Sequence, residues 1–236
     1  NDPSIAPEGY LIRTNYSFSG QKNKGAGYVR YITAEKLFKG ANLSPRFLLQ
    51  DASRCLKNEL TKTDLIQVAE NLNNEQVFYP ISDYIVREYS TSALVVQGVK
   101  PGENPEFTTG YALLGLPLSS ITVPFWLSIE SGLPKTITGI SNEHAPVCNW
   151  SLNLKKKIFA LDWPENERYV NLSAIWNKNQ TGIWQQIKKQ ETPLLQKTIE
   201  TIDKWRVSGL EVQKISEFYS WYDQQVTSIM LSLLNK

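Results

Sequence analysis

The chain has 236 residues, with 25 basic and 23 acidic side chains and a formal net charge of +2 at pH 7. A hydrophobic content of 41% with 20% charged residues is ordinary for a globular protein and disfavours disorder. The balanced charge, with no basic run longer than Lys155–Lys157, argues against nucleic-acid binding. No stretch approaches the roughly 20 consecutive apolar residues that a membrane helix requires, so we expect no membrane partner.

The first element that we predict is a strand over residues 11–18. Its aromatic residues Tyr16 and Phe18 alternate with serines, which is the period-two pattern of an extended chain. A polar loop rich in Gly and Lys follows over residues 21–27. The sequence therefore indicates a strand and a loop before the first helix.

That first helix is predicted over about residues 31–38, and Gly40 stops it. The pair Ser44-Pro45 is a strong helix start, with the serine as N-cap and the proline in the first turn. One face of this second helix is traced by Leu48, Ala52, Cys55 and Leu56.

A third helix is predicted from a capping-box pattern, in which Asp64 follows Thr61 by three residues. The helical spacing continues through Leu65, Val68, Ala69 and Leu72.

The middle of the chain changes to strand patterns. Residues 92–99 and 107–114 are separated by the turn Pro101-Gly102 and predict a hairpin. Residues 121–129 form a further strand, in which Pro124 indicates a sheet edge or a bulge.

Near-continuous apolar runs occur in both strands of this hairpin, over residues 93–96 and 111–116. Such runs predict strands that are covered on both faces. After the strands, Cys148 is expected in a loop and the triplet 155–157 at a solvated strand end.

From Tyr169 onward the pattern is helical, and Gly209 ends one helix. The final helix has the clearest stripe of the chain, formed by Ile215, Tyr219, Tyr222, Val226, Ile229 and Leu233. We expect this stripe to face the core, and a seam between two copies in a homo-oligomer stays open as the alternative.

The order of the elements is a strand, helices, a hairpin with further strands, and helices. Elements segregated in this way indicate an α+β fold rather than alternating βαβ units. We treat residues 1–236 as a single domain.

The run from Leu11 to Arg30 reads L-I-R-T-N-Y-S-F-S-G-Q-K-N-K-G-A-G-Y-V-R. It resembles the second-half signature of the penicillin acyltransferase family of linear amide C–N hydrolases, which are N-terminal-nucleophile (Ntn) hydrolases. The resemblance is close over residues 10–38 and loose over most of the chain, including Thr109–Pro117 and Tyr169–Ile183. Those two segments look like features of an uncharacterised bacterial branch, which implies an exported protein, periplasmic or extracellular.

The resemblance implies a four-layer αββα fold with antiparallel sheets, and hydrolysis or acyl transfer at a linear amide C–N bond of a small molecule. Asn15, in the R-T-N context, is implied as the oxyanion-hole residue, since a side-chain amide is a neutral donor. Tyr16, Gly115 and Trp126 are implied to shape the acyl pocket. Arg30 is expected to anchor the loop before the first helix. No metal or organic cofactor is implied.

An Ntn nucleophile is the first residue of its mature chain, produced by autoprocessing, and its own α-amino group is the base. Residue 1 is Asn here, and Cys55 and Cys148 lie far from the start. We therefore expect this chain to be the C-terminal portion, partnered by an N-terminal segment or chain with a Cys nucleophile. Ser90–Ser92 stands where the family has an arginine, which argues against a carboxylate- or penicillin-like substrate.

An alternative of another class is a non-catalytic exported binding protein for a carbohydrate or protein ligand. The seven tryptophans support it, above all Trp126, Trp150 and Trp163 in the loop-rich middle. His144 is the only histidine, which disfavours a Ser-His-Asp triad and a zinc site. Whether Cys55 and Cys148 pair is left open.

Overall fold

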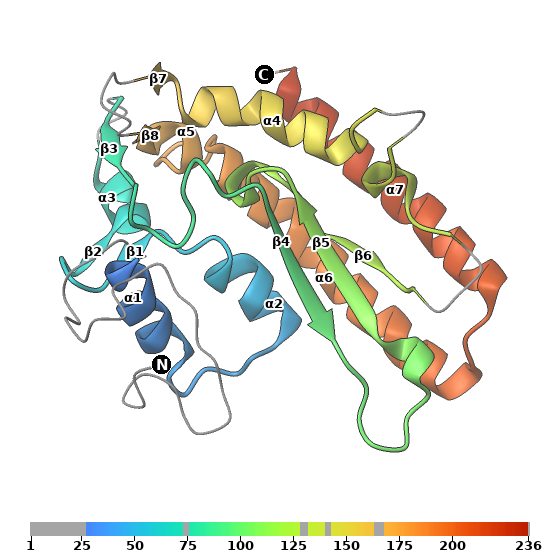
Figure 1. The fold of residues 1–236 in the computed structure, drawn as a ribbon. Coiled ribbons are helices and arrows are strands. Elements are labelled where there is room, and N and C mark those ends of the chain that lie inside the picture. Colours follow the sequence, from blue (N-terminus) through green and yellow to red (C-terminus); the bar gives the residue numbers. More distant parts are fainter. Residues whose placement is uncertain (1–26, 73–75, 128–131, 140–142, 163–167, 236) are drawn as a thin grey trace.

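The computed structural model describes residues 27–72, 76–127, 132–139, 143–162 and 168–235. The strand predicted over residues 11–18, with Asn15 and Tyr16, lies outside the described residues, and so does Trp163. The described part combines helices with three small antiparallel sheets (Figure 1). The predicted α+β class is confirmed.

The central sheet has the strand order β4-β5-β6. Its members are β4 (Ser92–Gln97), β5 (Thr109–Leu114) and β6 (Val123–Phe125). Strands β4 and β5 are antiparallel partners along their whole length, as the hairpin pattern predicts. Strand β6 is a short edge strand that contains Pro124, which confirms the prediction from that proline.

The two hairpin strands differ in burial. Strand β5 is buried on both faces along almost its whole length, as predicted. In β4 the prediction was wrong, because Leu94 is 63% exposed and Val96 is 61% exposed. Only the opposite face of β4 is covered, where Ala93 and Val95 pack beside the buried Leu49 and Leu195. An edge strand packed on one side keeps its other face in solvent.

Two smaller sheets flank this centre. Their strands are β1 (Lys57–Asn58), β2 (Thr63–Asp64), β3 (Phe78–Pro80), β7 (Leu161–Asp162) and β8 (Arg168–Asn171). Strands β1 and β2 form one pair, and the other sheet has the order β3-β8-β7.

Helices surround the sheets (Figure 1). The longer ones are α1 (Tyr28–Phe38), α3 (Leu65–Asn71), α4 (Pro146–Ile158), α6 (Ile183–Ser208) and α7 (Val212–Leu234). The short ones are α2 (Pro45–Phe47), the π-helix η1 (Leu48–Ala52), the 3₁₀ turns η2 (Pro105–Phe107), η3 (Pro117–Ser119) and η4 (Lys135–Ile137), and α5 (Leu172–Ile175). Helix α6 covers one face of the central sheet, and α7 packs beside α6 and α4.

The helix that starts at Ser44 begins as predicted and ends early. The Ser44 Oγ accepts a hydrogen bond from the Phe47 amide at 3.2 Å. Helical structure stops at Ala52, so the predicted helical position of Cys55 was wrong. The Ser53 amide donates to the Leu48 carbonyl at 3.0 Å, a five-residue step that widens the last turn into a π-helix.

The cap of α3 lies three residues later than predicted. The Asp64 Oδ1 accepts from the Ile66 amide at 3.0 Å, whereas the Thr61 hydroxyl bonds to Thr63 at 2.8 Å. Thr63 and Asp64 form strand β2 with β1, so the helix can begin only after them.

The predictions for Cys148 and for Lys155–Lys157 were wrong, because both lie in α4. Pro146 begins this helix, and the three lysines lie in its last turn. Positive charges at this end interact favourably with the helix dipole and stabilise the helix. Both Cys55 and Cys148 are free thiols, which settles the question of their pairing.

The two C-terminal helices match the sequence pattern. Gly209 ends α6 by donating its amide to the Trp205 carbonyl at 2.8 Å. The stripe of α7 faces the main hydrophobic core, where Tyr222, Val226 and Met230 are fully buried. Among the described helices, none combines the length and apolar character needed to span a membrane.

One ion pair lies inside this core. Two nitrogens of Arg54 donate to the two carboxylate oxygens of Glu191 at 2.8 and 2.9 Å, and both side chains are fully buried. Arg54 also donates to the carbonyls of Pro117 and Ser120, each at 2.7 Å. Its guanidinium lies 4.0 Å from the centroid of the Trp184 ring.

Glu191 has its own set of donors besides Arg54. It accepts from the Thr122 amide at 2.7 Å and from the Gln50 side chain at 3.1 Å. Burial acts to raise the pKa of Glu191, but attraction to Arg54 and these hydrogen bonds outweigh burial and hold that pKa below its ordinary value. The carboxylate is therefore ionised in the core.

The substitution Arg54→Met tests this pair. Removing one partner of a buried pair leaves the other charge uncompensated, so we expect the free energy of unfolding at pH 7 to fall by about 3–5 kcal/mol. Urea unfolding measures it. Arg206→Met, which removes an exposed partner of Asp203, is the matched control and should cost less than about 1 kcal/mol.

The same variant has a predicted pH dependence. Without the guanidinium, burial raises the pKa of Glu191 above its unfolded value, so the folded variant binds more protons than the unfolded chain. Its stability then increases as pH falls towards the ordinary carboxyl pKa, and the deficit against wild type shrinks. A deficit that stays constant between pH 7 and pH 4.5 contradicts this account.

Candidate functional site

An apolar groove of about 580 Å³ separates α1 from the outer edge of β4, and we call it the α1–β4 groove. Figure 1 shows α1 and α2 on the side of β4 away from β5. The groove is lined by Gly27, Arg30, Tyr31, Ala34, Phe38, Leu48, Ala52, Ser53, Ile85, Ala93, Leu94 and Val95.

Small residues on three separate elements leave this space empty. Ala34 lies on α1, Ala52 on η1 and Ala93 on β4, and all three line the groove. Larger apolar residues such as Phe38 and Leu48 complete the walls. The lining therefore suits an apolar group, and three methyl side chains set how much room it has.

The charged group of the groove is held by an ion pair. Arg30 Nη1 lies 2.7 Å from Asp83 Oδ1, and the same oxygen accepts from the Gly27 amide at 3.1 Å. Burial and the nearby Arg87 lower the pKa of Arg30, and Asp83 acts in the opposite direction. Arg30 and Asp83 thus anchor the start of α1 at Gly27, whereas residues 21–26 of the loop that Arg30 was expected to anchor lie outside the described residues.

Gly115 ends strand β5 and approaches α4. Its φ of 90° is in the left-handed region, and a β-carbon there would collide with the side chain of Ser151. Its amide donates to the Thr91 carbonyl at 2.9 Å. Gly115 is therefore required for close packing of β5 on α4, and it does not line the α1–β4 groove.

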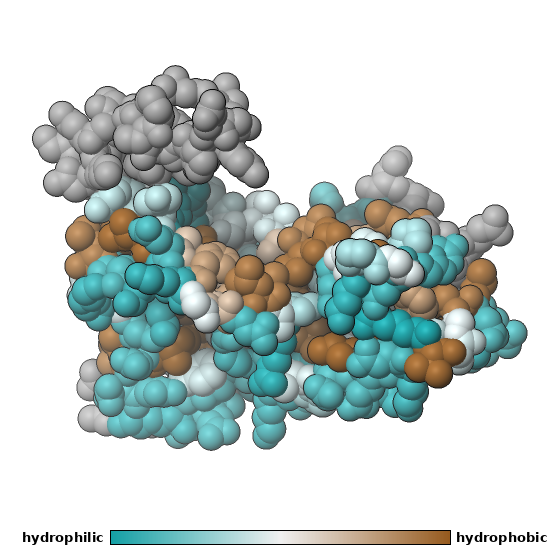
Figure 2. All heavy atoms as spheres, turned by 90° about the horizontal axis from the view of Figure 1, so that it is seen from below, coloured by the Kyte–Doolittle hydropathy of each residue, from teal (hydrophilic) through white to brown (hydrophobic). Residues whose placement is uncertain are grey.

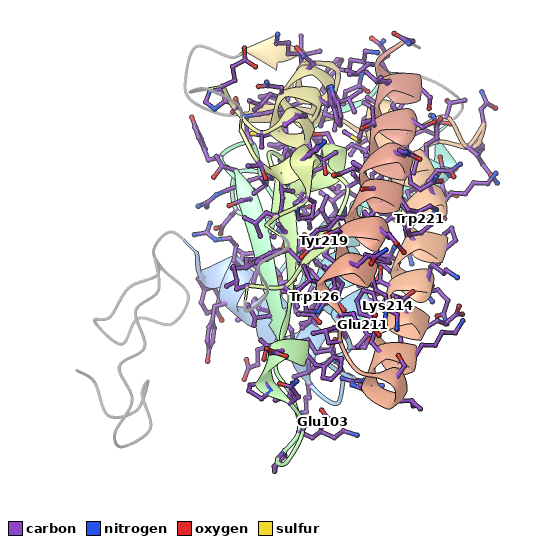
Figure 3. All side chains as sticks on the ribbon, turned by 90° about the vertical axis from the view of Figure 1, so that its right-hand side faces the viewer. Glu103, Trp126, Glu211, Lys214, Tyr219 and Trp221 are labelled. Atoms are coloured by element: carbon purple, nitrogen blue, oxygen red, sulfur yellow. The ribbon has the colours of Figure 1, made fainter. Side chains whose placement is uncertain are left out.

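Trp126 is 1% exposed and lies among aromatic rings of α6 and α7. Its ring stacks on Tyr219 with centroids 5.7 Å apart, and Figure 3 shows the two side by side. The Trp126 Nε1 donates to Thr109 at 2.9 Å and its amide to the Tyr219 hydroxyl at 2.8 Å. The structure does not bring Trp126 and Gly115 to the groove, and their roles in an acyl pocket stay predictions.

A second groove of about 830 Å³ lies between α4, η4 and α7, and we call it the α4–α7 groove. Its half-buried aromatic residue is Trp150, and Asp223 holds its η4 wall by accepting from Thr136 Oγ1 at 2.6 Å and from the Lys135 amide at 2.8 Å. The other lining residues are Leu133, Pro146, Ser216, Tyr219, Ser220, Gln224, Thr227 and Ser228.

The side chains of the described residues suit the binding of a ligand better than nucleophilic attack on a substrate. Burial raises the pKa of the Cys55 and Cys148 thiols, which keeps them protonated and weakly nucleophilic. The buried hydroxyls of Ser119 and Ser151 bond to each other at 3.0 Å. Within the described ranges, no group of three or more His, Cys, Asp or Glu side chains could hold a metal ion.

Comparison of the chain with protein-family models, with curated proteins and with solved structures found no match in any of the three.

Neither the alanines of the groove nor Asp83 stood out in the sequence. The three alanines are widely separated along the chain, so no local pattern connects them. Asp83 follows the short apolar segment around Ile81 and carries no motif. The sequence signal for Asp83 was Arg30, which lies three residues after the Gly-rich loop and needs an acidic partner when partly buried.

The substitution Asp83→Ala tests the anchor. It removes the acceptor of both Arg30 and the Gly27 amide, so we expect the free energy of unfolding to fall by about 1 kcal/mol, a value discounted for partial exposure. Chemical unfolding of Asp203→Ala, at an exposed pair, gives the control value near zero. Equal losses in the two variants would show that Asp83 anchors nothing.

Proposed function

We propose that this chain supplies the acyl-binding and oxyanion-stabilising part of an enzyme that hydrolyses a linear amide or transfers its acyl group. One observation carries the proposal. Gly27, the last residue of the Gly-rich loop that follows the R-T-N segment, lines the α1–β4 groove. In this proposal Asn15 donates beside the groove, and an apolar groove with an oxyanion donor is the combination that binding of an acyl group requires.

The groove favours a neutral aliphatic or aryl acyl group. Its volume of about 580 Å³ lies within the range of small-molecule sites. Among the described residues that line it, the one cation is Arg30, and Arg30 is already paired with Asp83 rather than available to a substrate carboxylate. The presence of Ser90–Ser92 in place of the family's arginine supports the same substrate class.

In the proposed mechanism the upstream segment supplies an N-terminal Cys. Its α-amino group takes the thiol proton, and the thiolate attacks the amide carbonyl. The Asn15 amide donates a hydrogen bond to the oxyanion that forms. The leaving amine takes the proton as the C–N bond breaks, and water or an acceptor amine then attacks the thioester to release the acyl group.

The fold and the location belong to the same proposal. The β4-β5-β6 sheet would form part of one of two central sheets in a four-layer Ntn fold, with the helices outside. Export to the periplasm or the cell exterior follows from the same resemblance.

The test uses the protein produced from its complete coding sequence, assayed against N-acyl amides of increasing chain length. We expect N-terminal analysis to find a polypeptide that begins with Cys, and Asn15→Ala to lower kcat about 10²–10³-fold because one oxyanion donor is lost. Asn42→Ala, at an exposed asparagine, is the matched control. Absence of an N-terminal Cys refutes the proposal.

A variant of the groove tests the acyl site separately. Ala93→Trp fills the space beside β4, so KM should rise for long acyl chains and stay unchanged for an acetyl group. An equal effect on all chain lengths would mean that the acyl group binds elsewhere.

A second candidate, a saccharide site in the α4–α7 groove, is favoured by Trp150. Its half-buried ring lies beside hydroxyl and amide side chains of α7, such as Ser220 and Gln224, which is the usual pairing of a stacking face with hydrogen-bonding groups. Calorimetric titration with neutral oligosaccharides should show binding that Trp150→Ala abolishes and Leu152→Ala, at an exposed position of α4, retains. If the wild-type protein shows no heat of binding, the saccharide site is contradicted.

A further inference from the structure

Arg87 is a half-buried cation beside the α1–β4 groove. It follows Ile85, which lines the groove, by two residues. The Arg87 amide donates to the Ser90 Oγ at 3.1 Å, and the Ser90 amide donates to the Arg87 carbonyl at 2.9 Å, so a closed turn fixes the backbone here. Among the described residues, the Arg87 guanidinium has no carboxylate within ion-pair distance and donates no hydrogen bond. Its N–H donors are therefore available to a ligand.

The charges at this end of the groove do not cancel. Arg30 is paired with Asp83 at 2.7 Å, so Arg87 is left as a second cation without its own carboxylate. Burial and then repulsion from Arg87 lower the pKa of Arg30, which means that the two guanidinium groups lie close together. A partly buried cation in this position attracts an anion. A guanidinium suits a carboxylate best, because it can donate two parallel hydrogen bonds to the two oxygens.

The groove adds an apolar wall that is open to solvent. Phe38 and Leu94 both line it, although they are 40% and 63% exposed. On the face shown in Figure 2, hydrophobic residues form several separate patches, so exposed apolar surface alone marks no site. The groove differs because it combines a hollow of about 580 Å³ with a cation beside it. An apolar chain in this hollow gains free energy by removing Phe38 and Leu94 from water.

We propose that the α1–β4 groove binds an aliphatic carboxylate, with its apolar tail along Phe38 and Leu94 and its carboxylate at Arg87. The site does not require the proposed amide chemistry. If that chemistry holds, such an acid is the product of hydrolysis of an aliphatic amide. The tail inside the groove is uncharged in both cases, which agrees with the neutral acyl group that the lining favours.

The two halves of the site exclude simpler ligands. Inorganic phosphate has the charge but lacks a tail that could cover Phe38 and Leu94. A long-chain alcohol has the tail but lacks the charge that Arg87 would pair with. Each of these molecules satisfies one half of the site, so the pair of them separates the contribution of the groove from that of the cation.

Calorimetric titration of the full chain with decanoate, below its micelle-forming concentration, tests the site. We expect decanoate to bind more tightly than decanol, and inorganic phosphate not to bind. Arg87→Gln should lower the affinity for decanoate about tenfold or more, because charge-assisted hydrogen bonds are lost, and leave the affinity for decanol unchanged. Lys204→Gln, at an exposed cation of α6, is the matched control and should bind as wild type does. Equal decanoate affinities of wild type and Arg87→Gln overturn the proposal.

A second variant tests the place of the tail. Ala34→Phe fills the groove from α1, so it should weaken the binding of decanoate and decanol by the same factor. Circular dichroism and urea unfolding show whether this variant is folded as wild type is. A folded Ala34→Phe protein that binds decanoate as before would mean that the tail lies elsewhere, and this result also overturns the proposal.

The outcome is separable from that of the proposed function. If both hold, decanoate inhibits the hydrolysis of an N-decanoyl amide competitively, and Arg87→Gln raises the inhibition constant. Binding of decanoate that depends on Arg87, in a protein without measurable amide hydrolysis, supports the carboxylate site alone. Amide hydrolysis that decanoate does not inhibit supports the chemistry alone and contradicts the carboxylate site.

Discussion

The buried pair of Arg54 and Glu191 sets the position of the elements around the groove. Two charges in a core are tolerated only when nearly every donor and acceptor has a partner, and the hydrogen bonds of this pair meet that requirement. The pair joins the end of η1, the segment between β5 and β6, and α6. Because Leu48 and Ala52 of η1 line the α1–β4 groove, the shape of the groove depends on a contact outside it.

Local signals in the sequence predicted the elements that local forces decide. Ser44 caps its helix, Gly209 ends another, and the hairpin around Pro101-Gly102 forms with the expected partners. The predictions were wrong where the position of an element in the folded chain decides its burial or its boundaries. The apolar run of β4 does not reveal that β4 is an edge strand, and Asp64 displaces Thr61 as a cap because a two-residue strand intervenes.

The candidate site divides in the same way. Asn15 was predicted from a contiguous motif and stays a prediction, and Arg30 was noted from its place after a loop, since both signals are local. The sequence did not predict the α1–β4 groove. The groove is space left by small alanine side chains on elements that meet only in the folded chain. The sequence also predicts a surface position for a charged residue such as Glu191. Its buried partner, Arg54, is 137 residues away, so no local pattern connects the two.

The π-helix η1 has a consequence for how this protein can change over time. A π turn holds one residue more than an α turn, and each residue of a regular helix rotates the next side chain by about 100°. Deleting one residue from η1 would restore a regular helix and rotate the Arg54 side chain away from α6. The carboxylate of Glu191 would then be buried in the apolar core without its cation. The extra residue and the charge pair are therefore inherited or lost together, and related chains should keep both or neither.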